Sequence, residues 1–326
     1  MDDKENFARP LLETRGLSRA FGAGNRVVRA VQDVDLAVYP GEVLGLVGES
    51  GSGKSTIGRL VLRLIEPSAG DIVFEGESIA GISERKLKPF RRKAQMVFQD
   101  PFASLNPRLD VEAIIGEALD AHGLYRGARR RARIGDLLEM VGLPASAMGR
   151  YPHEFSGGQR QRIGIARALA VEPKLIVADE PVSALDVSVQ AQVLNLMQEL
   201  RHRLGLAMIL ISHDLDVVEL MSDRIAVLYL GRIMEQGPAA DIVAAPRHPY
   251  TRALIAASPK ADPDATRVPV ALTGELPSPL SPPSGCVFRT RCPHAQAVCA
   301  DQVPVLRGEG AHRFACHFDL APQSLG

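Results

Sequence analysis

A glycine-rich loop constrains the fold of this chain more than any other feature. Residues 48–56 read Gly-Glu-Ser-Gly-Ser-Gly-Lys-Ser-Thr and fit the pattern G-x-x-x-x-G-K-[ST]. An apolar run at 42–47 precedes the loop, and a helical pattern at 57–65 follows it. In such a loop backbone N–H groups can surround phosphate oxygens, and the helix start adds partial positive charge. The motif predicts a strand–loop–helix unit that binds phosphate.

The residue types in the loop also predict a magnesium site. Lys54 is expected to reach the β- and γ-phosphates, and the Ser55 hydroxyl to complete the magnesium shell. Asp179 and Glu180 end the apolar run at 175–178, which places them where α/β proteins bind ligands. Asp179 would hold magnesium, and Glu180 would polarise the attacking water. The other loop residues expected around the phosphates are Gly48, Glu49, Ser50, Gly51, Ser52, Gly53 and Thr56.

Short apolar runs alternate with helical patterns along the first part of the chain. Buried strands are predicted at 42–47, 94–98, 175–178, 208–211 and 225–229. A crossover helix is predicted at 187–204, and helical patterns fill 110–151. The alternation predicts an α/β domain with a mainly parallel sheet and an inserted helical subdomain.

Proline marks a change of character near residue 237. Of 23 prolines, 13 follow Gly237, so the end of the chain is expected to be an irregular, turn-rich extension. The stretch 276–285 holds four of them and is excluded from helix and central sheet, because proline lacks the N–H that those structures need.

Charge and hydropathy exclude several classes of protein. Lys and Arg total 38 and so do Asp and Glu, which argues against a polybasic nucleic-acid binder. No apolar run is long enough for a transmembrane helix, and the polar start does not resemble a secretory signal. A cytosolic protein is therefore expected, with any membrane role coming through a partner. The Arg-rich run 126–133 is either a solvated helix face or an electrostatic patch for nucleic acid or phospholipid.

All four cysteines lie late in the chain, at Cys286, Cys292, Cys299 and Cys316. In a reducing cytosol such a cluster favours a metal site over a disulfide framework. The intervening stretches of five, six and sixteen residues do not match a zinc ribbon. Four thiolates still suit a tetrahedral zinc site or a cluster, and an unligated or disulfide state is the third possibility.

Residues 155–162, Phe-Ser-Gly-Gly-Gln-Arg-Gln-Arg, precede a helical pattern at 163–169 and resemble the signature motif of ATP-binding-cassette ATPases. Ser156 is a good helix N-cap, and the residues carried over from the motif are Ser156, Gly157, Gly158 and Gln159. Gln99 resembles the Q-loop glutamine, which senses magnesium and the γ-phosphate, and His213 the switch histidine. Asp186 ends a D-loop-like stretch at 183–186. Phe21 is either the aromatic that stacks on adenine or an ordinary core residue.

The resemblance implies a nucleotide-binding domain at 1–237 with a helical subdomain at about 105–165, and an extension at 238–326. It implies ATP and Mg²⁺ as ligands. It also implies a head-to-tail dimer in which each ATP lies between the phosphate loop of one subunit and the signature helix of the other.

Further stretches resemble the branch that imports oligopeptides, dipeptides and nickel, and most closely its second peptide-importer ATPase subunit. They are 99–108, 150–155, 248–254, 276–279 and 285–293. This resemblance implies a second cassette subunit, two permeases, an extracytoplasmic binding protein as an indirect partner, and no nucleic acid. It implies a peripheral position on the cytoplasmic side of the plasma membrane. For the cysteines it favours a [4Fe–4S] cluster, with zinc second.

Three alternatives remain at this stage: an importer of nickel or another solute, a soluble cassette ATPase acting on nucleic acid or the ribosome, and a P-loop kinase. Specificity in an importer would reside in other subunits. Phe102, Leu105, Ile114 and Ile115 form either an apolar patch for the permease or part of the core.

Overall fold

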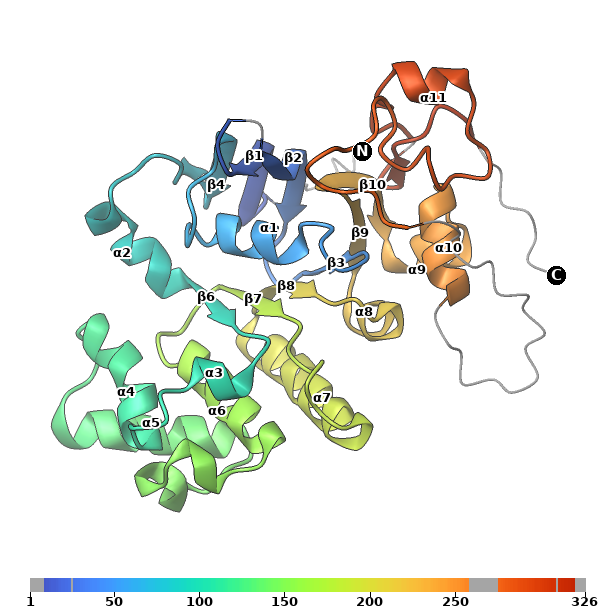
Figure 1. Ribbon diagram of the computed structural model, residues 1–326. Coiled ribbons are helices and arrows are strands. Elements are labelled where there is room, and N and C mark those ends of the chain that lie inside the picture. Colours follow the sequence, from blue (N-terminus) through green and yellow to red (C-terminus); the bar gives the residue numbers. More distant parts are fainter. Residues whose placement is uncertain (1–8, 25, 258–274, 309, 320–326) are drawn as a thin grey trace, which may run out of the picture. The chain divides into compact units, whose positions relative to one another are not determined.

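The computed structural model describes residues 9–24, 26–257, 275–308 and 310–319 (Figure 1). The chain divides into two compact units. The first comprises residues 1–12, 37–42 and 73–210, and the second comprises residues 13–36, 43–72 and 211–326. Both units are therefore built from segments that lie far apart in the sequence.

The first unit contains three neighbouring strands, β6 (Ala94–Val97), β7 (Leu175–Asp179) and β8 (Ala207–Ile211). β6 and β7 run parallel, with Ala94 opposite Leu175. All residues of β7 and β8 are buried, as expected for strands covered on both faces. The predictions at 94–98, 175–178 and 208–211 are confirmed within a residue.

Between β6 and β7 the chain is helical (Figure 1). These helices are α3 (Pro101–Ser104), α4 (Val111–Ala121), α5 (Gly127–Met140), η1 (Ala145–Gly149), η2 (Pro152–Glu154) and α6 (Gly157–Leu169). The first unit also has β5 (Glu77–Ser78), α2 (Glu84–Lys93) and α7 (Val187–Leu204), the last with the predicted bounds. Asp110 begins α4 by accepting a hydrogen bond from the Ala113 N–H at 2.8 Å.

Most of the suspected permease patch is core. Leu105, Ile114 and Ile115 are at most 2% exposed, whereas Phe102 is 60% exposed. The Phe102 ring lies 4.0 Å from the guanidinium of Arg160, close enough for a cation–π contact. The hypothesis of one continuous apolar surface is therefore wrong, because three of its four residues pack inward.

The Arg-rich run lies at the start of α5, where acidic side chains neutralise part of its charge. Arg130 donates two hydrogen bonds to the Asp120 carboxylate, each of 3.0 Å, and its Nη1 lies 3.7 Å from Glu112 Oε1. Arg133 lies 3.4 Å from Glu172. Such pairing favours the solvated helix face over an anion-binding patch.

The second unit contains both parallel and antiparallel strand pairs. β3 (Val43–Val47) runs parallel to β9 (Arg224–Tyr229), and β10 (Arg232–Pro238) runs antiparallel to β9. β11 (Arg313–Phe314) pairs antiparallel with β10. Leu230 and Gly231 join β9 to β10 and both have positive φ, as a two-residue hairpin requires. This antiparallel edge was not predicted, because Leu-Gly is not a typical hairpin sequence.

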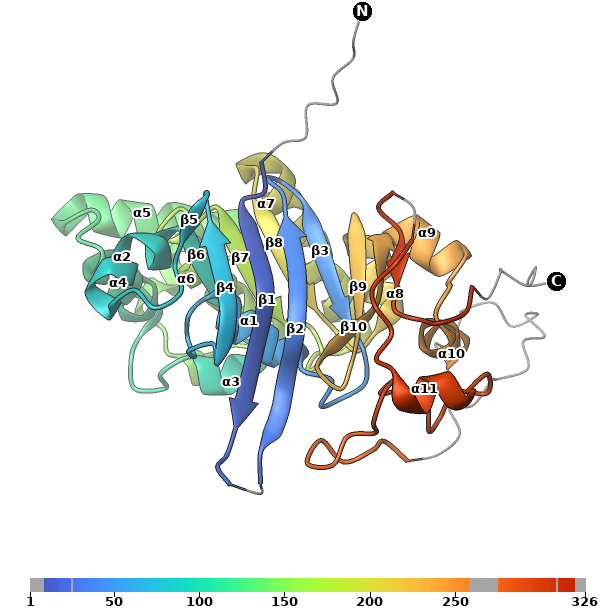
Figure 2. The ribbon, with the colours of Figure 1, turned by 90° about the horizontal axis from the view of Figure 1, so that it is seen from above.

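Three further strands of the second unit lie side by side in the order β2-β1-β4 (Figure 2). They are β1 (Leu12–Phe21), β2 (Val28–Val38) and β4 (Ala69–Phe74). The last residues of β4, Val73 and Phe74, pair with β5. In β2 polar residues such as Gln32, Asp33 and Asp35 interrupt the apolar ones, so the strand contains no long continuous apolar run. For that reason the apolar runs of the sequence did not predict this sheet.

The helices of the second unit are α1 (Lys54–Val61), α8 (Leu215–Met221), α9 (Ala239–Ala244), α10 (Pro249–Ala257) and α11 (Ala297–Asp301). The helix predicted at 57–65 began three residues late and ended four residues late. α1 begins within the phosphate loop, and soon after its end Arg63 turns left-handed at φ 52°. The buried Arg63 forms an ion pair with Glu66 just after the end of α1.

Residues 275–308 and 310–319 are called here the C-terminal segment. It is mostly turns and bends around α11 and β11, and residues 276–285 contain neither helix nor strand, as predicted. Residues 258–274 and 320–326 of the expected extension lie outside the described residues. Across the described ranges, every helix is too short or too polar to cross a membrane.

Candidate nucleotide site

The loop between β3 and α1 requires glycine at two positions. Gly48 has φ 149° and Gly53 has φ 105°. A Cβ on Gly48 would lie 2.2 Å from the Leu228 carbonyl oxygen, and one on Gly53 2.3 Å from the Ala30 carbonyl oxygen. Both distances are shorter than contact allows, so any other residue would displace the loop backbone. The glycines therefore maintain the loop shape that the motif predicted.

Lys54 begins α1 and is 5% exposed. Its ammonium donates hydrogen bonds to the Gly48 carbonyl at 2.6 Å and to the Glu49 carbonyl at 3.0 Å. Gly53 is the N-cap of α1 and has no side chain that could cap the helix. A helix start with exposed N–H groups and a lysine beside it attracts anions. The second unit thus carries an arrangement that suits an anion such as phosphate.

The first unit carries the acidic residues. Asp179 ends β7 and is 3% exposed, and the next residue, Glu180, has φ 45°. A left-handed backbone is uncommon for glutamate and is concentrated at functional sites. Gln99 follows the neighbouring strand β6, and its Nε2 donates to Glu180 Oε2 at 2.8 Å. Because β6 and β7 are parallel neighbours, their carboxyl ends bring these two predicted catalytic side chains together.

Ser156 begins α6 with a reciprocal pair of hydrogen bonds. Its Oγ accepts from the Gln159 N–H at 3.3 Å, and Gln159 Oε1 accepts from the Ser156 N–H at 3.0 Å. A Cβ on Gly158 would lie 2.3 Å from Val189 Cγ1, so glycine permits close packing of α6 on α7. Asp186 is the residue before α7. The signature-like residues are therefore grouped at one helix start.

Two predicted residues lie elsewhere on the second unit. His213 is exposed and follows the end of β8. It is flanked by Ser212 and Asp214, and Asp214 caps α8. Phe21 ends β1, is 38% exposed, and lies 4.6 Å from the guanidinium of Arg19. That exposure excludes Phe21 from the core.

None of the four cysteines is joined in a disulfide. Burial raises the pKa of Cys292 to about 11, with smaller contributions from the neighbouring thiolates of Cys286, Cys316 and Cys299. The Cys286 N–H donates to the Cys299 carbonyl at 2.8 Å, so these two cysteines lie side by side. Within the described residues, however, no three or more His, Cys, Asp or Glu side chains are arranged to hold a metal ion. The donor set suits a metal chemically, but its arrangement does not support the predicted cluster or zinc ion.

Sequence reasoning missed how the C-terminal part contacts the loop. Arg291 forms an ion pair with Glu49, with Nη1–Oε2 at 2.6 Å, and the Tyr250 hydroxyl accepts from the Glu49 N–H at 2.9 Å. The stretches that contain Arg291 and Tyr250 were selected only for their resemblance to peptide importers. The signal that the sequence offered for this contact was a charged residue, Arg291, in a proline-rich segment.

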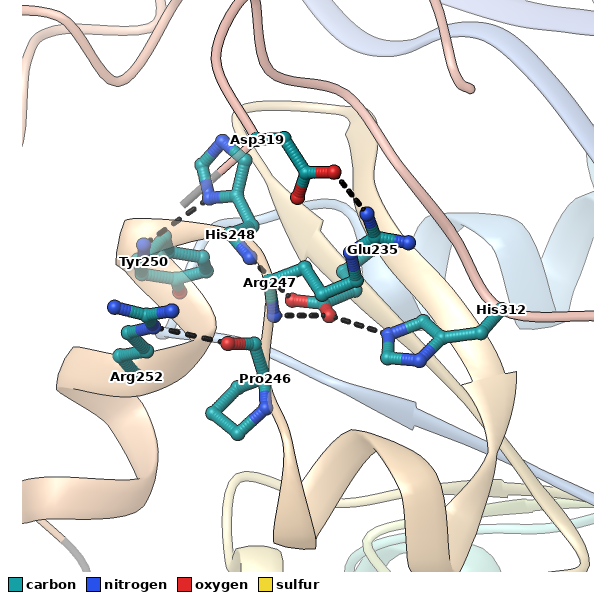
Figure 3. Close-up of polar contacts among 8 residues, drawn as sticks. All are labelled: Glu235, Pro246, Arg247, His248, Tyr250, Arg252, His312 and Asp319. Atoms are coloured by element: carbon teal, nitrogen blue, oxygen red, sulfur yellow. Dashed lines mark hydrogen bonds and ion pairs between the residues drawn. The ribbon is translucent and has the colours of Figure 1, made fainter. Parts of the chain in front are cut away.

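Glu235 on β10 holds two further parts of the second unit together (Figure 3). The carboxylate is fully buried and accepts from the backbone N–H groups of Arg247 at 2.7 Å and His248 at 2.9 Å. His312 Nε2 lies 2.7 Å from the same carboxylate. Beside them Arg247 forms an ion pair with Asp319. These contacts attach the C-terminal segment to β10.

Comparisons with known proteins agree with this organisation. The family described as ABC transporter matches residues 31–183, and the family described as oligopeptide/dipeptide transporter, C-terminal region, matches residues 234–299. A Brucella ovis protein named as a peptide import ATP-binding protein is 57% identical over 298 residues, covering 91% of this chain and 94% of its own. The oligopeptide transport ATP-binding protein AppF of Bacillus subtilis is 52% identical and covers 89% of each chain.

Solved structures give the same result. The ATP-binding cassette MJ0796, a dimer bound to ADP and phosphate, matches with a TM-score of 0.64 at 30% identity over 70% of this chain and 98% of its own. The cbiO1 protein of Clostridium perfringens, part of the ABC transporter complex cbiONQ, has a TM-score of 0.64 at 28% identity over 72% and 90%. This chain therefore belongs to the ABC transporter family, in its oligopeptide/dipeptide transporter branch.

Proposed function

We propose that this chain hydrolyses ATP to power the import of oligopeptides or dipeptides through membrane permease subunits. The observation that carries the proposal is the match of residues 234–299 to the C-terminal region of oligopeptide/dipeptide transporters, behind a cassette with a phosphate loop. Relatives named for peptide import align with nearly the whole chain. No observation of this chain favours nickel, nucleic acid or a kinase substrate.

The residues of the phosphate loop bind the nucleotide. Lys54 leaves the Gly48 and Glu49 carbonyls to contact the β- and γ-phosphates, and backbone N–H groups of residues 48–56 surround them. Ser55, Gln99 and Asp179 are the residues that would hold Mg²⁺, and the ion would neutralise charge on the phosphates. Phe21 stacks on adenine.

The catalytic residue is Glu180, which orients or deprotonates the attacking water. Gln99 holds the Glu180 carboxylate at 2.8 Å. Release of this hydrogen bond by Gln99 would leave the carboxylate available to water. His213 contacts the γ-phosphate from the end of β8.

A complete site needs a second cassette subunit. The start of α6, with Ser156, Gly157, Gly158 and Gln159, binds the γ-phosphate held by that subunit's phosphate loop, and Asp186 lies beside the shared boundary. A helix N-terminus suits this role, because its N–H groups point towards an anion. The capping box explains why the helix begins at this serine.

Assembly places the chain at the cytoplasmic side of the membrane, bound to two permeases and served by an extracytoplasmic binding protein. Residues 1–237 form the cassette, residues about 105–165 its helical subdomain, and residues 238–326 the extension. Phe102 contacts a permease, since it is the exposed member of the suspected patch.

The C-terminal cysteines bind a [4Fe–4S] cluster, with zinc as the alternative. The support is the donor set alone: four cysteines outside any disulfide lie in one segment that has little regular structure, although no three of them are arranged to hold a metal within the described residues. The group would supply structural cross-links, and no catalytic step requires it.

Glu180→Gln tests the catalytic assignment. The amide keeps the size of the side chain but cannot take a proton, so turnover should fall by about 10²–10⁴ while ATP still binds. ATP binding and phosphate release by the purified chain measure the two effects. Glu199→Gln is the matched control, because Glu199 is an exposed residue of α7 that pairs with Arg203. Turnover by Glu180→Gln equal to that of Glu199→Gln would exclude Glu180 as the base.

A further inference from the structure

The C-terminal segment reaches the phosphate loop through one buried arginine. Both terminal nitrogens of Arg291 donate to Glu49, with Nη1–Oε2 at 2.6 Å and Nη2–Oε1 at 3.1 Å. The Arg291 side chain is 5% exposed and that of Glu49 is 27% exposed. A two-point contact of this kind fixes direction as well as distance. The segment therefore holds the second residue of the loop in one orientation.

The main chain of Glu49 is held as well. Tyr250 on α10 is fully buried, and its hydroxyl accepts from the Glu49 N–H at 2.9 Å. Burial raises the pKa of Tyr250, so the phenol stays neutral. Two elements outside the loop thus hold Glu49, one by its side chain and one by its backbone.

Aromatic packing sets the position of Arg291. The Phe288 ring centroid lies 5.3 Å from those of Tyr229 and Tyr250, and the last two lie 4.7 Å apart. Arg291 Nη1 also donates to the Tyr229 hydroxyl at 3.5 Å. Because these rings are fully or almost fully buried, Arg291 extends from a packed aromatic cluster rather than from a loose loop.

Glu49 connects this aromatic cluster to the lysine that is expected to bind phosphate. Its carbonyl accepts from Lys54 Nζ at 3.0 Å, and the preceding Gly48 carbonyl accepts at 2.6 Å. A shift of Glu49 would move two of the groups that position Lys54. Arg291 therefore acts on Lys54 through one intervening residue.

Stability alone is a poor explanation for this ion pair. Replacing a buried pair by apolar residues is often neutral or stabilising, because both charges lose water. Among the described residues Arg291 Nε is buried without a hydrogen-bond acceptor, which adds to the cost. A costly pair that connects two segments 242 residues apart indicates a role in orientation.

We propose that Arg291 is a positioning residue for ATP binding, which holds the phosphate loop in its binding shape through Glu49. ATP affinity then depends on the C-terminal segment being attached to the cassette. This inference rests on the proposed assignment of residues 48–56 to ATP.

Arg291→Gln in the full chain is the first test. The dissociation constant for a fluorescent ATP analogue should rise about 5- to 150-fold, the usual range of coupling between sites. At saturating ATP the turnover should change little, because Glu180 is untouched. Arg289→Gln is the matched control: Arg289 is half-buried, and its guanidinium hydrogen-bonds to Ser284 of the same segment. Equal affinities for the two variants would overturn the proposal.

Glu49→Gln and the double variant separate positioning from general damage. If Arg291 acts through Glu49, adding Arg291→Gln to Glu49→Gln should change affinity little further. Fully additive losses would overturn the proposal. Tyr250→Phe keeps the packed ring but removes the hydroxyl, and should weaken binding in the same direction. It also serves if Arg291→Gln fails to fold.

Lys54→Ala distinguishes failure of this inference from failure of the proposed site. Lost binding in Lys54→Ala with normal binding in Arg291→Gln would overturn the inference alone. Normal binding in Lys54→Ala would overturn the assignment of the loop and the inference with it.

Discussion

At the scale of single residues, Ser156 shows how structure and chemistry can be separated. Its hydroxyl caps α6, and the proposed function adds contact with ATP held by a partner subunit. Aspartate is an equally good N-cap, and a negative charge is favourable at a helix start. The two roles therefore respond differently to one substitution.

Ser156→Asp should fold normally and bind ATP normally as an isolated chain, but should lose ATPase activity in the assembled transporter. The reason is repulsion between the carboxylate and the γ-phosphate across the dimer. Thermal unfolding and ATP titration of the chain, with ATPase measurement of the assembly, check this. Ser156→Ala is the comparison and should cost about 1 kcal/mol of stability through the lost cap. Weak ATP binding by the isolated Ser156→Asp chain would place Ser156 in its own site.

Residue burial also decided questions that residue type left open. Leu105 and Phe102 are both apolar and three positions apart, yet one is 1% exposed and the other 60%. Phe21 is equally ambiguous by type, and its 38% exposure excludes core packing. Sequence names a side chain's preference, but neighbouring elements determine whether space exists to bury it.

At the scale of elements, the C-terminal segment is the unusual part. It contains one five-residue helix and a two-residue strand among its described residues, yet it buries Phe288 and Phe314. Contacts to β10 and to the phosphate loop hold it, through Glu235 and Glu49. A segment with so little regular structure would gain from a metal, since structural zinc contributes on the order of 10–16 kcal/mol in small domains.

Elemental analysis of protein purified without oxygen tests the proposed cluster. We expect a brown protein with about four iron and four sulfide per chain. Cys292→Ser should lose iron while retaining the cassette fold. Zinc in place of iron would select the alternative, and metal-free protein would contradict both.

At the scale of the whole molecule, the free energy of unfolding is expected to depend on pH through one buried histidine. His248 is fully buried, and this burial lowers its pKa from 6.5 to about 4. The charge that faces it is the Glu235 carboxylate, which opposes the shift only in part. Its Nδ1 accepts from the Tyr250 N–H at 3.1 Å, which requires that nitrogen unprotonated (Figure 3).

The unfolded chain binds a proton on this residue near pH 6.5, and the folded chain binds it only near pH 4. Stability is therefore greatest above pH 6.5 and falls as the pH drops from 6.5 to 4, by about 3 kcal/mol from this group. Urea unfolding across that range measures it. His248→Asn should flatten the slope, whereas His202→Asn, at an exposed position of α7, should not. An unchanged slope in His248→Asn would remove His248 as the source.

Local pattern alone predicted much of the candidate site. The strand–loop–helix around Lys54, the acids that end β7 and the cap at Ser156 are each encoded within one short continuous stretch of sequence. Helix α7 was predicted to the residue, because caps and apolar periodicity act over one or two turns. Backbone hydrogen bonding and side-chain alternation are local, so the sequence by itself determined these elements.

Only the tertiary structure decided which distant segments meet. Glu49 and Arg291 pair across 242 residues, and Glu235 and His312 across 77. The antiparallel strand β10 also escaped prediction, because its turn residues, Leu230 and Gly231, are atypical of a hairpin. Such contacts depend on packing in three dimensions, because a buried charge pairs with an opposite or polar group that the fold places beside it. No spacing along the chain encodes that choice.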